Sequence, residues 1–99
     1  MIEEYDFCAT LHTTRSKRRV AQLFRPPTWG GRMCSWTDYE IRSAFAELVV
    51  EADSPILLHG RATDLATNAE LILAPLQAAE IAYEAEGYGA DGALLWNRS

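Results

Sequence analysis

The apolar residues of this chain recur with two periods, one typical of strands and the other typical of helices. Over residues 4–12 polar residues alternate with apolar ones, which are Tyr5, Phe7, Ala9 and Leu11. A period of two places every second side chain on the same face of a strand. The pattern therefore predicts a half-buried strand over 4–12.

A short helix is predicted directly after this strand, over 16–24. Its apolar face would consist of Val20, Leu23 and Phe24. Thr13, Thr14 and Ser16 offer hydroxyls that can cap the first turn, and Pro26 and Pro27 end the helical segment. Residues 28–36 contain glycines and tryptophans without a clear period, so we expect a loop there with a strand fragment.

A second helix is predicted over 38–51, where the first turn carries a capping signature. Thr37 and Glu40 have the spacing at which a threonine hydroxyl and a glutamate carboxylate cap one another's backbone N–H groups. The apolar residues that follow at helical spacing are Ile41, Ala44, Phe45 and Leu48. The short apolar run over 55–60 then predicts a strand.

The last third of the chain, from Glu70 to Asn97, predicts a strand, a helix and a strand. The apolar run over 71–74 indicates a buried strand, and Pro75 fits the first turn of a helix over 75–86. Gly87 would end this helix, since glycine adopts the left-handed conformation at low cost. Residues 93–96 then predict the final strand.

Without residues 13–36, this order of elements is strand, helix, strand, strand, helix, strand. The order is that of the ferredoxin-like split β-α-β layout, with both helices on one face of a four-stranded sheet. We therefore expect a single α+β domain over 1–99, in which 13–36 is an inserted helix and loop.

In this layout most strands would carry apolar residues on both faces. Leu71, Ile72 and Leu73 are consecutive, for example, so they would point to both sides of the sheet. A large exposed apolar surface is uncommon on a monomer, so the insert or a second subunit would cover it. We expect a homodimer.

Composition limits the class of protein. Apolar residues make up 48% and charged residues 23% of the chain, as in ordinary globular domains. No apolar run approaches the ~20 residues of a membrane span, and the acidic start of the chain is not a secretion signal. We expect a cytoplasmic protein without a membrane segment.

Charge is distributed unevenly along the chain. No acidic residue lies between Phe7 and Thr37, and this window holds six bases, while the remainder holds 3 bases and 14 acids. The overall charge of −5 argues against a nucleic-acid partner. A local basic segment over 15–32 with nearby aromatic rings can bind an anionic small molecule or an acidic partner. The alternative is a solvated helix face, or bases that pair with acids of the same or a neighbouring chain.

The sequence thus predicts a non-enzymatic module that binds an anionic group. The candidate ligand-binding residues are Arg15, Lys17, Arg18, Arg19, Arg25, Trp29, Arg32 and Trp36. The alternative hypothesis is a small enzyme with an apolar pocket lined by Trp29, Met33, Trp36 and Tyr39. In this pocket, the side chain that moves a proton would be His12, His59 or Cys34. This alternative depends on an analogy between folds.

No cofactor, metal or catalytic residue is assigned from the sequence. Cys8 and Cys34 lie too far apart in the chain for a metal-binding pair, and their redox state stays open. His12 and His59 would need a third ligand to hold a metal. In the expected strand order their strands are not neighbours, so we do not expect the two histidines to meet.

Overall fold

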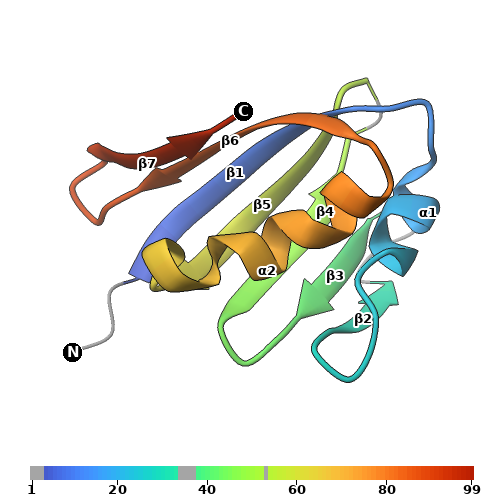
Figure 1. Ribbon diagram of the computed structural model, residues 1–99, viewed down its shortest axis with the longest axis horizontal. Helices are drawn as coiled ribbons and strands as arrows, with labels where there is room; N and C mark the ends of the chain where they lie inside the picture. Colours follow the sequence, from blue (N-terminus) through green and yellow to red (C-terminus); the bar gives the residue numbers. More distant parts are fainter. Residues whose placement is uncertain (1–3, 34–37, 53) are drawn as a thin grey trace.

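The strands of the protein form a single antiparallel sheet in the computed structural model, which describes residues 4–33, 38–52 and 54–99 (Figure 1). The order of the strands across the sheet is β2-β3-β4-β5-β1-β6-β7. In chain order the elements are β1 (Glu4–His12), α1 (Lys17–Gln22), β2 (Gly30–Met33), β3 (Tyr39–Arg42), β4 (Ala46–Glu51), β5 (Ile56–Thr63), α2 (Leu65–Ala78), β6 (Ala82–Tyr88) and β7 (Leu94–Arg98). The protein is therefore a small α+β protein, and the described part contains seven strands and two helices.

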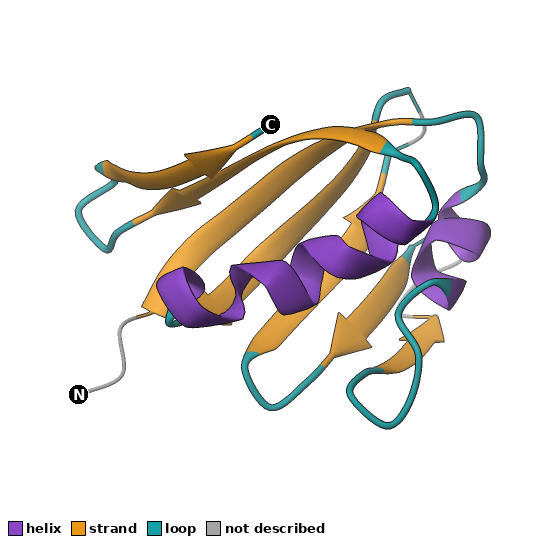
Figure 2. Cartoon of the chain, in the orientation of Figure 1, coloured by secondary structure: helices purple, strands orange, loops and turns teal. Residues whose placement is uncertain are grey.

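The core lies between the sheet and α2, which crosses one face of it (Figure 2). The strand predicted over 4–12 is confirmed as β1, which pairs with β5 on one side and β6 on the other. Its alternate residues Tyr5, Phe7, Ala9 and Leu11 are buried. The residues of α2 that join them in the core are Leu65, Ala69, Ile72, Leu73 and Leu76.

The short helix predicted after β1 is also confirmed. The Ser16 hydroxyl caps α1 by accepting a hydrogen bond from the Arg19 N–H at 3.2 Å. α1 packs against β3 and β4 and buries Val20. The expected strand fragment within 28–36 is β2, and the strand predicted over 55–60 lies within β5.

The helix predicted over 38–51 is wrong, because this segment forms the β3–β4 hairpin. Leu48 and Val50 are buried while Glu47 is exposed, so the buried positions of β4 follow a period of two. The sheet supplies backbone partners on both sides of β4, and this pairing overrides a local helical pattern. Thr37, half of the expected capping box, lies outside the described residues.

The assignment of the last third of the chain is also wrong in part. Residues 71–74 belong to α2, and Pro75 lies inside this helix rather than in its first turn. α2 ends at Ala78, so only residues 75–78 of the helix predicted over 75–86 are helical, and residues 82–86 belong to strand β6. The buried residues of α2 follow a helical period that begins at Leu65, well before the apolar run over 71–74 that we assigned to a strand. The strand predicted over 93–96 is confirmed as part of β7.

Gly87 does not end a helix, as the sequence suggested, but is a buried residue of β6. A Cβ atom at this position would lie 2.5 Å from Cδ1 of Leu65. The absence of a side chain therefore lets the first turn of α2 approach the sheet closely.

The expected four-stranded sheet with two apolar faces is not observed. The apolar residues at 71–73 lie on a helix, and the sheet face away from α2 carries mostly polar residues. On β1, for example, Asp6 and His12 are exposed on this open face, while Cys8 and Thr10 are partly buried. The premise from which we expected a covering subunit is therefore wrong.

We predict that Gly60→Ala lowers the free energy of unfolding by at least ~2 kcal/mol, measured by urea unfolding with tryptophan fluorescence. Gly60 has a φ of +152°, and a Cβ atom would lie 2.1 Å from the Glu47 carbonyl oxygen on β4. The matched control is Gly30→Ala, where a Cβ atom would meet nothing within 4 Å. The control should change stability by less than ~0.5 kcal/mol, and equal losses in both variants would contradict the packing argument.

Candidate functional site

A pocket of about 350 Å³ lies between α1 and the β2–β3 hairpin, and we call it the arginine pocket. Arg18, Ala21, Gln22 and Arg25 line it from α1 and the residues that follow. Arg18, Ala21 and Gln22 are spaced at i, i+3 and i+4 and so lie on one side of α1, and Arg25 follows the helix. The other lining residues are Phe24, Pro26, Gly31, Arg32, Met33 and Tyr39.

Among the described residues, three arginines and no acidic residue line the arginine pocket. Arg32 donates from Nε to Oε1 of Glu40 at 3.1 Å. Arg25 donates from Nε to the Gln22 carbonyl oxygen at 3.3 Å, a bond that does not neutralise its charge. Arg18 makes no hydrogen bond or ion pair with any described residue. A guanidinium without a carboxylate partner is available to bind a carboxylate or phosphate of a ligand.

The structure brings together three of the predicted ligand-binding residues, Arg18, Arg25 and Arg32. Arg15 points elsewhere and donates to the Ala79 carbonyl oxygen at 3.3 Å. Lys17 forms an ion pair with Asp38, with 3.7 Å between Nζ and Oδ1. Arg19 does not line the pocket, although it lies on the same helix. Trp36 lies outside the described residues.

Trp29 is a core residue rather than a ligand-binding one. It is only 4% exposed, and its ring packs edge-on against Phe24 and Phe45 with centroids 5.0 and 5.3 Å away. The apolar pocket of the enzyme hypothesis is therefore not lined by Trp29, although Met33 lines the arginine pocket. From the sequence we assigned Tyr39 to the pocket of the enzyme hypothesis and not to the ligand-binding residues, and we did not identify Gln22. Both residues line the arginine pocket because β3 forms and α1 lies beside β2, and no local sequence pattern indicates either arrangement.

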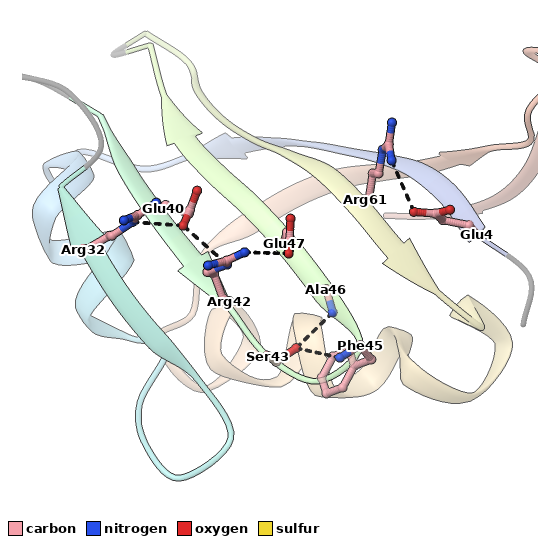
Figure 3. A network of polar contacts seen from close by, with 9 residues as sticks. All are labelled: Glu4, Arg32, Glu40, Arg42, Ser43, Phe45, Ala46, Glu47 and Arg61. Atoms are coloured by element: carbon pink, nitrogen blue, oxygen red, sulfur yellow. Dashed lines mark hydrogen bonds and ion pairs between the residues drawn. The ribbon is translucent and has the colours of Figure 1, made fainter.

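The open face of the sheet carries a ladder of alternating charges (Figure 3). From β2 inward, Arg32 and Arg42 both contact Oε1 of Glu40, and Arg42 also contacts Glu47 at 2.7 Å. Farther along the face, Arg61 lies 3.6 Å from Glu4. The arginines of this ladder have carboxylate partners, so the open face carries little uncompensated positive charge.

A second hollow, of about 480 Å³, lies over β1 and β5 on the open face. It contains the partly buried thiol of Cys8, directly across the strand pair from His59. Nε2 of His59 lies 2.5 Å from Oε1 of Glu51. We call this arrangement the thiol hollow. A carboxylate that orients an imidazole is one component of acid–base and nucleophilic sites.

The thiol in this hollow is a weak nucleophile at neutral pH. Burial raises the pKa of Cys8 above its ordinary value, and the carboxylates of Glu86 and Glu51 raise it further. Tyr88, which also lines the hollow, donates its hydroxyl to Glu86 at 2.7 Å, and this hydrogen bond raises the pKa of Tyr88. Arg61 also lines the hollow, but burial and the carboxylates near the thiol raise its pKa, so this environment does not activate the cysteine.

The strands of His12 and His59 are neighbours, contrary to our expectation. The histidines still lie apart, because His59 is opposite Cys8, four residues before His12 on β1. His12 instead pairs with Glu84, with 3.2 Å between Nε2 and Oε1. Within the described residues, no group of three histidine, cysteine or acidic side chains can hold a metal ion.

In the same part of the chain, neither helix has the length and apolar character needed to cross a membrane. Comparisons of the sequence with protein-family models and with curated proteins find no match, and neither does a comparison with solved structures. Function must therefore be argued from the pockets themselves.

We predict that Glu86→Gln accelerates alkylation of Cys8 by iodoacetamide at pH 8 by about threefold. Loss of a negative charge near the thiol lowers its pKa, so a larger fraction is thiolate at a given pH. The rate is measured by mass spectrometry in a Cys34→Ser background, with Glu47→Gln as the matched control. An unchanged rate in Glu86→Gln would show that this carboxylate does not act on the thiol.

Proposed function

We propose that this protein is a small non-enzymatic binding module that holds the anionic group of a ligand in the arginine pocket. The observation that carries the proposal is the convergence of Arg18, Arg25 and Arg32 around one pocket, in which no described lining residue is acidic. These residues are 14 positions apart in sequence at most, but they come from α1, the following loop and β2. Guanidinium groups from separate elements can hold one carboxylate or phosphate from several directions.

The walls of the arginine pocket favour a ligand with an apolar or flat part next to its charge. Met33 is 55% exposed, and Phe24 and Tyr39 also line the pocket. A volume of about 350 Å³ lies within the range of small-molecule sites. A long nucleic acid fits poorly, because the ladder on the neighbouring open face is rich in carboxylates and the chain carries a charge of −5.

We predict that pyrophosphate raises the melting temperature of the protein, and that Arg18→Gln and Arg25→Gln each weaken pyrophosphate binding at least tenfold. A tenfold loss corresponds to about 1.4 kcal/mol, within the range of a charge-assisted hydrogen bond. Binding is measured by thermal shift and by calorimetry at low ionic strength.

The matched control is Arg19→Gln, which removes the same charge from the same helix but lies outside the pocket. It should change pyrophosphate affinity less than twofold. If all three variants lose affinity equally, binding follows net charge and the arginine pocket is not the site. If no anion shifts the melting temperature, the proposed function is wrong.

A small enzyme is the second candidate function, and one observation favours it. The thiol hollow places His59, held by Glu51, on the strand directly beside Cys8. We rank it below the binding module because the pKa of the thiol is raised rather than lowered.

We still propose a homodimer, but not because of the apolar second sheet face that the sequence suggested. Strand β7 lies at the edge of the sheet, and its Leu94 and Leu95 are 49% and 54% exposed. Light scattering should give twice the chain mass of 11.1 kDa, and Leu95→Lys should return the monomer mass. A wild-type protein of single-chain mass at micromolar concentration would rule out the dimer.

We also propose that the sheet is an elaborated ferredoxin-like layout in a cytoplasmic protein. The adjacent order β4-β5-β1-β6, with α2 between β5 and β6, supports this interpretation of the fold. β2, β3 and β7 would then be additions at the edges. An experimental structure in which these four strands are not neighbours would contradict it.

A further inference from the structure

Strand β2 is an edge of the sheet, and its outer side has no strand partner within the described residues. All four residues of β2 are exposed. In an antiparallel pair, every second residue of an edge strand directs its N–H and C=O groups away from the sheet. β2 therefore offers free backbone donors and acceptors to a further strand.

The backbone of β2 is also easy to approach. The strand begins with Gly30 and Gly31, which carry no side chains that would keep a second backbone away. A Cβ atom at Gly30 would meet nothing within 4 Å, so the space on the face of the sheet where a side chain would lie is open. Glycine in a strand often marks a place where another backbone approaches closely.

The arginine pocket lies alongside this edge, because Gly31, Arg32 and Met33 belong both to β2 and to its lining. Arg18 and Arg25 add positive charge from the other wall of the pocket. A strand that pairs with β2 would thus place its side chains next to cations. Opposite charges between neighbouring strands stabilise the pair, and like charges destabilise it.

The other edge of the sheet has different chemistry. β7 exposes two leucines, and its Arg98 is already paired with Glu70 of α2. Of the two edges of the described sheet, it is the β2 edge that combines free backbone groups with cations that have spare hydrogen-bonding capacity. Since β2 is four residues long, backbone pairing alone would be weak, so the charges must supply much of the affinity.

We propose that an extended acidic segment of a partner protein adds to the sheet as a strand beside β2 and places a carboxylate in the arginine pocket. This inference rests on the proposed function, since it names the carrier of the anionic group. The backbone of the segment pairs with β2, and its acidic side chains select it over neutral or basic segments. Arg32 on the strand itself repels a basic segment.

The test measures binding of a fluorescein-labelled octapeptide in which glutamate alternates with valine, by fluorescence polarisation. A second peptide has glutamine in place of each glutamate, and a third is the acidic peptide with a methyl group on every backbone nitrogen. The acidic peptide should bind at least tenfold more tightly than either of the other two. Arg18→Gln should weaken its binding at least tenfold, and Arg19→Gln less than twofold.

Amide hydrogen exchange provides the structural readout. The acidic peptide should slow exchange at residues 30–33, whereas pyrophosphate, which cannot pair with a strand, should not. Equal binding of the methylated peptide, or binding without protection at 30–33, would overturn strand addition. If the protein binds pyrophosphate through Arg18 but no acidic peptide, the inference fails and the proposed function stands. If it binds neither, both are wrong.

Discussion

The pairing of β1 with two neighbours is the constraint on which the rest of the structure depends. β5 pairs with β1 from Glu4 to Leu11, and β6 pairs with it from Asp6 to His12. A shift of one residue in either ladder would turn Phe7 and Leu11 away from α2 and expose them. The burial of alternate residues on β1 therefore sets the register of the three central strands and decides which face of the sheet receives the helix.

The register of β1 also determines which residues lie on the open face of the sheet. Because the apolar residues of β1 point toward α2, its remaining residues, such as Asp6 and Cys8, must lie on the open face. The polar residues of the neighbouring strands meet them there and form pairs such as His59 with Glu51. Because the charges on this face pair with one another, they attract a charged partner only weakly.

The edge of the sheet near α1 and β2 does not depend on the register of β1, and the positive charge is concentrated there. α1 buries Val20 and leaves Arg18 and Arg19 exposed. Trp29 anchors the loop between α1 and β2 by packing between Phe24 and Phe45. An anchored loop holds Arg25 and Arg32 near Arg18, and this arrangement gives the arginine pocket its form. The core thus supports the candidate site without supplying any of its charge.

Some features of the molecule follow from the sequence alone, because they depend on residues close together in the chain. The strict alternation over 4–12 specifies β1, the capping hydroxyls over 13–16 indicate where α1 begins, and the run of bases without acids identifies the region of the arginine pocket. The sequence does not indicate which of these bases converge, because Arg18 and Arg32 come together only when β2 folds back beside α1. Likewise, residues 38–51 and 71–86 have apolar patterns that fit either a helix or strands. Backbone pairing with distant strands, and burial of Leu65 and Ile72 against the sheet, decided between them. Those interactions join residues far apart in the chain, so only the tertiary structure could determine them.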